Sequence, residues 1–253
     1  EVREALLPSS TPTVPGYDVA ALHLGSDDLG GDFHDFVELP DGRLGLLVCD
    51  VSGRGLPGAL VGATARSYLR AELARGGDLL QSLPRHARDG PGPDLLQSLH
   101  HINRQIARDV RRGMFVSALY VLLEPGAHRA QVACAGHKVP LVRCVAADGK
   151  VRTIQPEGIA LGFDKGPIFE RALQLAEVEL AAGDRLVLSN TGPVVMQDAS
   201  GKEFGEKQFY AAIQKFGGRP GQEMLDRLRT IFESFHDGVS LPRDIAVVTL
   251  ART

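Results

Sequence analysis

Two aspartates stand where carboxylates commonly do chemistry, each beside glycines at one end of a strand-like segment. Asp32 follows Gly30 and Gly31, and Asp50 closes an apolar run in the sequence CDVSGRG. If the two segments pair as a hairpin across the intervening Asp-Gly turn, both carboxylates reach the same end of a sheet, where they repel each other unless a cation lies between them. Mg²⁺ and Mn²⁺ prefer such oxygen ligands, so the pattern indicates a divalent metal site. In the alternative interpretation, the two aspartates only cap a turn and a strand.

Other polar residues mark further candidate positions. His137 follows a strand-like segment within a glycine turn, where it acts as a general acid or as a hydrogen-bonding group that holds the turn. The apolar segment 185–188 ends in Ser189, Asn190 and Thr191, and a strand that ends in small polar residues often borders a site. The glycine-rich sequence GRGLPG lacks the lysine and hydroxyl residue of a phosphate-binding loop, and no GxSxG or HExxH motif occurs.

The periodicity of apolar residues predicts the elements that position these groups. Strands are expected, with apolar side chains at strand spacing or in continuous runs, at residues 17–24, 32–39, 43–52, 114–124, 128–136, 139–146, 169–180, 185–188 and 244–252. Helices are expected, with apolar side chains at helical spacing, at residues 56–74, 94–112, 204–216 and 222–235. Asp94 is a good N-cap for the second helix, and Gly76 and Gly77 are expected to end the first. The long runs of consecutive strands favour antiparallel sheets in an α+β fold.

The sequence predicts one domain preceded by a short connecting segment. Residues 1–7 are similar to the end of a helix, and residues 8–15 are rich in proline, serine and threonine, so residues 1–16 are expected to be a helix tail and linker. No linker-like stretch interrupts residues 17–253, which are therefore expected to form a single domain. We expect this domain to belong to a longer protein, with a helix that enters from the N-terminal side.

The composition excludes several classes of protein. The 253 residues are 43% hydrophobic and 23% charged, with a formal net charge of −3 and no basic stripe, which argues against a nucleic-acid binder. No apolar run is long enough to span a bilayer, and the N-terminus has no basic-then-apolar signal pattern. Cys49, Cys134 and Cys144 form no CxxC pair, so they are expected to be reduced, buried thiols of a cytoplasmic protein.

Seven segments, in order along nearly the whole chain, resemble the motifs of one family. They are GGDFHDF, GRLGLLVCDVSGRGLPGAL, MFVSALYVLLE, ACAGHKVPLV, GIALGF, LAAGDRLVLSNTGPV and PRDIAVVTLAR. This pattern is similar to that of the SpoIIE/RsbU-type bacterial branch of the metal-dependent protein phosphatases, the PPM or type 2C superfamily. The resemblance implies a four-layer α-β-β-α sandwich, in which helix pairs flank two antiparallel sheets. It also implies hydrolysis of phosphoserine or phosphothreonine by a water that Mn²⁺ or Mg²⁺ activates.

The resemblance implies a divided set of metal ligands. The family's bridging aspartate falls on Asp50, its adjacent carbonyl ligand on Val51, and the acid after the glycine pair on Asp32. These residues would serve one metal ion, and Asp32 and Asp50 would be the catalytic residues. The second metal ion depends on two positions that hold Thr191 and Arg243 here in place of aspartate. At most one Mn²⁺ or Mg²⁺ ion is therefore expected.

The two replaced ligands change the charge of the expected site. Thr191 lacks one negative charge, whereas Arg243 differs from aspartate by two units and neutralises nearby carboxylates. A unit charge within about 4 Å is worth roughly 4 kcal/mol at a surface-like dielectric, so metal binding should weaken strongly. Asp244 follows Arg243 and is the alternative ligand, but a slip of one residue turns its side chain to the other face of the strand.

Two functions follow from the resemblance. The first is a pseudophosphatase or catalytically impaired domain that works in signalling. The second is an active Mn²⁺- or Mg²⁺-dependent serine/threonine phosphatase with a reduced metal site. In either case the family implies partner switching that regulates sigma factors, a phosphorylated or unphosphorylated partner of the anti-anti-sigma type, and an upstream sensor domain. The helices at residues 56–74 and 94–112 are candidates for a homodimer surface, although packing on a sheet explains their apolar faces equally.

Overall fold

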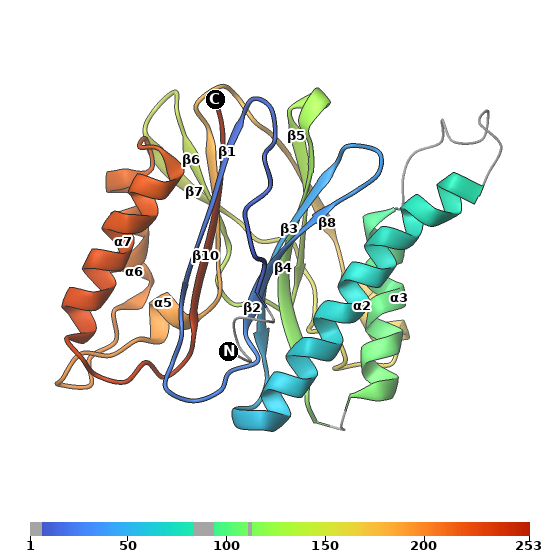
Figure 1. Cartoon of the computed structure of the whole chain (residues 1–253), viewed down its shortest axis with the longest axis horizontal. Helices are drawn as coiled ribbons and strands as arrows, with labels where there is room; N and C mark the ends of the chain where they lie inside the picture. The colour runs from blue at the N-terminus through green and yellow to red at the C-terminus, as the bar shows by residue number, and fades with distance from the viewer. Residues whose placement is uncertain (1–6, 83–93, 111–112) are drawn as a thin grey trace.

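Two five-stranded antiparallel sheets lie face to face in the computed structural model, which describes residues 7–82, 94–110 and 113–253 (Figure 1). The first sheet has the strand order β1 (Tyr17–Leu24), β10 (Ile245–Arg252), β9 (Arg185–Ser189), β6 (Leu141–Val145) and β7 (Lys150–Ile154). The second sheet has the strand order β2 (Phe33–Glu38), β3 (Leu44–Val51), β4 (Val116–Glu124), β5 (Arg129–Ala135) and β8 (Leu175–Glu179). All neighbouring strands pair in antiparallel register.

Helices cover the outer face of each sheet and complete the four layers (Figure 1). The helices on the second sheet are α2 (Gly55–Ser82) and α3 (Leu95–Asp109), and those on the first are α6 (Gly205–Phe216) and α7 (Gly221–His236). The short elements are η2 (Pro125–Ala127), α4 (Pro167–Ala172) and α5 (Gly192–Val195). Three apolar cores separate the layers, and the middle core lies between the two sheets. The α+β sandwich that the sequence predicts is therefore confirmed.

Strand β3 shows why the sequence forms these layers. All eight of its residues are buried, because helices cover one face of the strand and the first sheet covers the other. Leu47 and Cys49 pack on the helix side, whereas Leu46 and Val48 point between the sheets. By this alternation Asp50 shares the inner face with Val48. The strand therefore delivers a carboxylate to the edge of the space between the sheets.

Several predicted local features are confirmed. Strands β2 and β3 form the expected hairpin across the Asp-Gly turn. Asp94 caps α3, because its carboxylate accepts a hydrogen bond from the Leu96 amide at 2.9 Å. All three cysteines are free. Cys49 and Cys134 are buried as expected, whereas Cys144 is only half-buried, so its expected burial is wrong.

The sequence prediction differs from the structure in three places. Helix α2 does not end at Gly76 and Gly77 but continues to Ser82, because a glycine weakens a helix by only about 1 kcal/mol relative to alanine. The strand expected at residues 169–180 divides into helix α4 and strand β8. The Asp164 carboxylate causes this change, since it accepts hydrogen bonds from backbone amides in the first turn of α4. Strand β7 is absent from the sequence prediction, and its residues are mostly exposed at a sheet edge.

Every described helix and strand lies within residues 17–253. Among the described residues, no helix combines the length and the apolar character that crossing a membrane requires. The expected helix tail at residues 1–7 lies almost wholly outside the described residues, and so does the expected end of the second helix at residues 111–112.

A buried ion pair anchors α2 to the second sheet close to the predicted site. Asp35 on β2 is fully buried, and its carboxylate lies 2.8 Å from Nε of Arg66 and accepts two hydrogen bonds from Arg70. Loss of one member of such a pair leaves an uncompensated buried charge, which is strongly destabilising. The pair therefore fixes α2 against the strand that begins next to Asp32.

His34 makes the stability of the fold depend on pH. Its alternation with Phe33 and Asp35 predicts a surface or packing residue, and the structure buries it at 5% exposed. Burial and the neighbouring His23 lower the pKa of His34 from 6.5 to about 4. The charge of Asp35 raises this pKa, and the charge of Arg66 lowers it. The unfolded chain therefore takes up the proton first as the pH falls. The free energy of unfolding is expected to drop by roughly 3 kcal/mol between the two pKa values.

Urea unfolding of the parent domain and of His34→Gln between about pH 7 and about pH 4 measures this contribution. The variant should be less sensitive to acid than the parent, because it has no imidazole to protonate on unfolding. His128→Asn changes an exposed histidine and should keep the sensitivity of the parent. Equal acid sensitivity in the parent and His34→Gln would contradict the assignment.

Candidate functional site

The predicted site residues meet at one end of the sandwich, where strands of both sheets begin or end. Asp32 lies directly before β2, and Asp50 lies near the end of β3, both in the second sheet. Thr191 lies just after β9, and Arg243 lies just before β10, both in the first sheet. Direct hydrogen bonds join these residues, so positions far apart in the sequence form one cluster.

The guanidinium group of Arg243 occupies the centre of this cluster. Its Nε and Nη2 donate a bidentate pair of hydrogen bonds to Asp32, at 2.9 Å to Oδ2 and 2.6 Å to Oδ1. Nη2 also donates to the Val51 carbonyl oxygen at 3.0 Å, and Nε lies 3.6 Å from Oδ1 of Asp50. One cation therefore contacts all three groups that the family resemblance implies as ligands of the retained metal ion.

Thr191 holds the second carboxylate without adding charge. Its hydroxyl donates to Oδ1 of Asp50 at 2.7 Å, and its backbone amide donates to the same oxygen at 3.1 Å. An aspartate at this position would instead place a second negative charge against Asp50, and two carboxylates so close repel each other. The hydroxyl and the guanidinium together thus satisfy both aspartates of the cluster.

Asn190 joins three segments of the cluster, a role that the sequence analysis does not assign to it. Its side chain is fully buried, and Nδ2 donates to the Asp244 carbonyl oxygen at 2.6 Å and to Oδ2 of Asp32 at 3.3 Å. Its Oδ1 accepts a hydrogen bond from the Ala246 amide at 2.9 Å. The polar end of the segment 185–188 is the sequence signal for this position, but it does not reveal the partners.

His137 is packed beside Asp50. It is 2% exposed, and its Nε2 lies 2.8 Å from the Ser189 carbonyl oxygen, which only accepts hydrogen bonds, so Nε2 is the donor. Its Nδ1 lies 3.5 Å from Oδ2 of Asp50 and 3.5 Å from Oγ of Ser117. The bond to Ser189 agrees with the expected structural role, and the contact with Asp50 adds His137 to the cluster. Its role as a general acid stays a prediction.

Asp244, the alternative metal ligand, holds a neighbouring loop. Its Oδ1 accepts hydrogen bonds of 2.8 Å from both the amide and the hydroxyl of Ser26. A Cβ atom on Gly30 would lie 2.4 Å from Oδ2 of Asp244, so the close approach of this carboxylate requires glycine. The side chain therefore supports the loop before Asp32, and its role as a metal ligand stays a prediction.

Burial dominates the electrostatics of Asp32. It raises the pKa of this carboxyl to about 6, while the hydrogen bond from Arg243 acts in the opposite direction and the charge of Asp50 raises the pKa further. The Arg243 side chain is 30% exposed and the Asp32 side chain 4% exposed, so the carboxylate is the more desolvated partner. Two carboxylates and one guanidinium leave this trio with no more than one net negative charge.

The residues as arranged do not fit a divalent metal ion. Both oxygens of Asp32, the Val51 carbonyl oxygen and Oδ1 of Asp50 already accept hydrogen bonds from Arg243 or Thr191. An ion that used these oxygens would have to displace the guanidinium, which is itself a cation. Within the part of the chain that the structure describes, no group of three or more histidine, cysteine, aspartate or glutamate side chains is placed to hold a metal ion.

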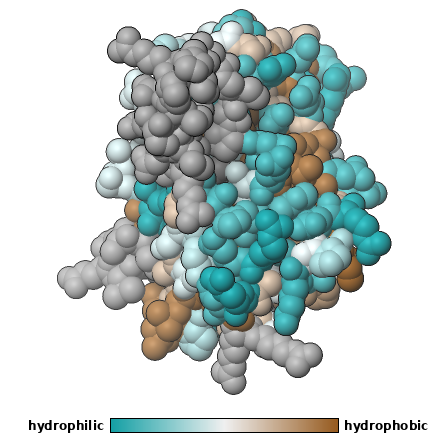
Figure 2. Space-filling model, turned by 90° about the vertical axis from the view of Figure 1, so that its right-hand side faces the viewer, coloured by the Kyte–Doolittle hydropathy of each residue, from teal (hydrophilic) through white to brown (hydrophobic). Residues whose placement is uncertain are grey.

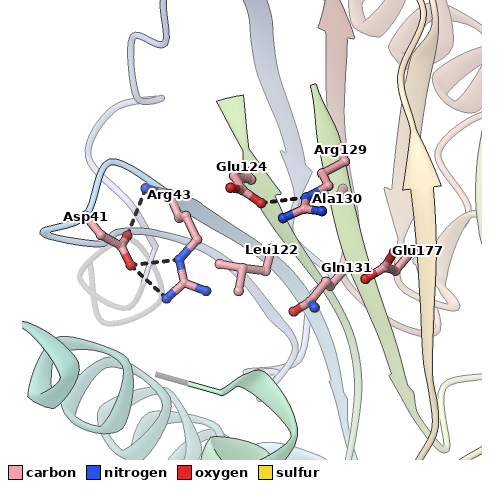
Figure 3. Close-up of a pocket in the computed structure, with 8 residues that line it drawn as sticks. All are labelled: Asp41, Arg43, Leu122, Glu124, Arg129, Ala130, Gln131 and Glu177. Carbon is pink, nitrogen blue, oxygen red and sulfur yellow. Dashed lines mark hydrogen bonds and ion pairs between the residues drawn. The ribbon is translucent and has the colours of Figure 1, made fainter. Parts of the chain in front are cut away.

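Two cavities lie at opposite ends of the second sheet. A cavity of only about 30 Å³ lies beside the cluster, with Arg54 in its wall. A separate cavity of about 350 Å³ lies on the second sheet (Figure 3). In its wall, ion pairs of 2.8 Å and 2.7 Å join Arg43 to Asp41 and Arg129 to Glu124. Both arginines of the larger cavity are therefore already neutralised.

The chain matches one family model and is similar in sequence to a known phosphatase. The model described as "Stage II sporulation protein E (SpoIIE)" matches residues 40–253. The chain is also 24% identical, over 252 residues, to the phosphoserine phosphatase RsbU of Bacillus subtilis (strain 168). That match covers 99% of this chain and 68% of the relative.

Solved structures agree with this assignment at the level of the fold. The RsbU and RsbW domains of Rv1364c from Mycobacterium tuberculosis match with a TM-score of 0.74 and 22% identity, over 98% of this chain and 63% of that one, which is less than two thirds of its length. The SiaA-PP2C domain of Pseudomonas aeruginosa matches with a TM-score of 0.69 and 23% identity, over 93% of this chain and 84% of that one. Because the fold is that of PP2C-type phosphatases and the family model spans most of the residues, the chain belongs to the SpoIIE family.

Proposed function

We propose that this domain is a SpoIIE/RsbU-type pseudophosphatase, which works in bacterial signalling by binding a regulatory protein and has no metal-dependent phosphatase activity. The observation that carries the proposal is the guanidinium of Arg243. It contacts Asp32, Val51 and Asp50, where the family resemblance implies a metal ion. Thr191 supports the proposal, because its hydroxyl satisfies Asp50 where the resemblance implies a further charged ligand.

The energetics favour the guanidinium over a metal ion. A divalent ion placed about 4 Å from the guanidinium would be repelled by roughly 4 kcal/mol for each of its charges at an effective dielectric constant of 20. Displacement of Arg243 instead breaks its bidentate contact with Asp32, whose side chain is 4% exposed. Both routes oppose metal binding. We therefore expect this cluster to hold neither Mn²⁺ nor Mg²⁺ at concentrations that load an intact centre.

The partner that we propose is a regulatory protein of the anti-anti-sigma type in a partner-switching system for a sigma factor. One relative is named a phosphoserine phosphatase, and one solved relative combines RsbU and RsbW domains. Those names support regulation through phosphorylation and protein contacts. The proposal includes residues 17–253 as the folded unit and an upstream sensor joined through residues 1–16. It also includes a homodimer surface on α3 and on the part of α2 beyond Leu60. The free cysteines suit a cytoplasmic setting.

The alternative function is an active Mn²⁺- or Mg²⁺-dependent phosphatase with a reduced metal site. It is supported by the presence of Asp32, Asp50 and the Val51 carbonyl oxygen at one end of the sandwich. The Arg243 side chain would have to leave the cluster before such an ion could use these oxygens. Its 30% exposure is the feature of the structure that favours this alternative.

Hydrolysis of a phosphoaryl ester separates the two functions. The parent domain is expected to show no turnover that depends on Mn²⁺, and its rate should equal that of Asp50→Asn, because the cluster holds no ion for Asp50 to bind. Colorimetric assays with and without Mn²⁺ measure the rates, with the Bacillus subtilis relative as the positive control. Metal-dependent turnover that disappears in Asp50→Asn would establish the active alternative.

A further inference from the structure

The face of the molecule that carries α2 and α3 is largely hydrophilic, with hydrophobic side chains gathered in a few patches (Figure 2). Leu56 and Leu60 are 63% and 59% exposed near the start of α2, and their spacing of four residues puts them on one side of the helix. Phe115 and Phe163 are 37% and 72% exposed. Their rings meet edge to face, with centroids 6.3 Å apart. Of the large apolar side chains in the described part of the chain, only Ile168 is comparably exposed.

Hydrogen bonds hold the segments that carry the two aromatic rings against the end of β3, close to the start of α2. The Ser52 amide donates to the Phe115 carbonyl oxygen at 2.9 Å, and the Phe115 amide donates to Oγ of Ser52 at 2.6 Å. Val116 and Leu161 exchange backbone hydrogen bonds of 2.9 Å and 2.8 Å, which brings Phe163 beside Phe115. The rings and the exposed leucines therefore flank the strand end that carries the candidate site.

Exposed cations border these apolar side chains. Arg54 precedes Leu56 by two residues, Lys165 follows Phe163 by two residues, and both cations are exposed. Neither forms an ion pair with another residue in the described ranges. The carboxylate of Asp164, beside Lys165, is turned onto backbone amides at the start of α4. A chain with a net charge of −3 thus presents unpaired positive charge at this position.

We infer that this apolar and cationic surface docks a regulatory protein that presents apolar side chains flanked by carboxylates. The surface comprises Leu56, Leu60, Phe115 and Phe163 with Arg54 and Lys165. The inference rests on the proposed function for the class of partner, which is the anti-anti-sigma type. Aromatic and arginine side chains contribute much of the binding energy at protein interfaces, and a cationic border selects an acidic partner. A partner docked here lies next to the Arg243 cluster.

Calorimetric titration with purified, unphosphorylated anti-anti-sigma protein from the same organism tests this surface. Leu60→Glu and Phe163→Glu are each expected to weaken binding by at least about tenfold, because each puts a carboxylate into the apolar contact. Arg54→Glu should also weaken binding, and added salt should weaken binding to the parent. Ala211→Glu is the matched control, since Ala211 is exposed on α6 in the opposite outer layer, and it should bind like the parent.

Parent-like binding by Leu60→Glu and Phe163→Glu would overturn the inference, and so would the absence of any binding by the parent. Sedimentation that shows a parent dimer dissociated by these substitutions would also overturn it, because a second copy would then cover the surface. Thermal melting confirms that each variant is folded. The phosphatase assay is a separate readout: metal-dependent hydrolysis would refute the proposed function, whereas the titration alone decides the docking surface.

Discussion

Replacement of Thr191 and Arg243 together by aspartate is expected to raise the affinity of the domain for Mn²⁺ by at least about a thousandfold. The double substitution changes the charge of the cluster by three units, one at Thr191 and two at Arg243. A single unit charge within about 4 Å is worth roughly 4 kcal/mol, which corresponds to about a thousandfold in affinity. Calorimetric titration of Mn²⁺ into the parent and into Thr191→Asp/Arg243→Asp measures the change.

The control for this prediction has the same shape without the added charge. Thr191→Asn/Arg243→Asn removes the guanidinium and introduces neutral side chains close in size to aspartate. It should bind Mn²⁺ much more weakly than the double aspartate variant, because it lacks two carboxylates. If the two variants bind Mn²⁺ equally, positions 191 and 243 do not correspond to the family's metal ligands.

Removal of the guanidinium alone is expected to lower the free energy of unfolding by about 3 to 5 kcal/mol at a pH above the raised pKa of Asp32, where its carboxyl is charged. Arg243→Leu leaves the Asp32 side chain, which is 4% exposed, without its bidentate partner. An unpaired buried carboxylate is costly because the interior solvates it poorly. Urea unfolding of the parent and of Arg243→Leu measures the loss, and Arg54→Leu at an exposed position is the control. A loss no larger than that of the control would contradict the role of the ion pair.

The effect of Arg243→Leu should also vary with pH in a defined direction. Burial raises the pKa of Asp32 to about 6 with the guanidinium in place, and the pKa rises further without it. Below that pKa the carboxyl is neutral, so the destabilisation is complete at higher pH and shrinks as the pH falls through the pKa. Arg243→Leu with Asp32→Asn removes both charges and should recover most of the stability that Arg243→Leu loses at high pH.

The sequence predicts those parts of the fold whose signals are local. The apolar run of β3 and the Asp-Gly turn before it lie within a few residues of each other, and both the strand and the hairpin are confirmed. Residues 169–172 alternate like a strand, but the Asp164 carboxylate satisfies the first amides of a helix there. Strand β7 has mostly exposed side chains, so it lacks the apolar pattern that reveals buried strands.

The members of the candidate site are easier to predict than their connections. The glycine-flanked positions of Asp32 and Asp50 point to a shared sheet end, and the family motifs draw attention to Thr191 and Arg243. The contact between Arg243 and Asp32 spans 211 positions, and nothing local to either residue specifies it. The burial of His137 against Asp50 depends in the same way on strands that meet only in the folded domain.

Titration of the parent domain with Mn²⁺, followed by calorimetry, tests the central claim most directly, because the claim is that a guanidinium stands in place of a metal ion. Thr191→Asp/Arg243→Asp serves as the variant expected to bind. The parent should show no saturable heat at millimolar Mn²⁺, and Asp50→Asn should give the same trace. Saturable binding of Mn²⁺ by the parent, lost in Asp50→Asn, would contradict the account.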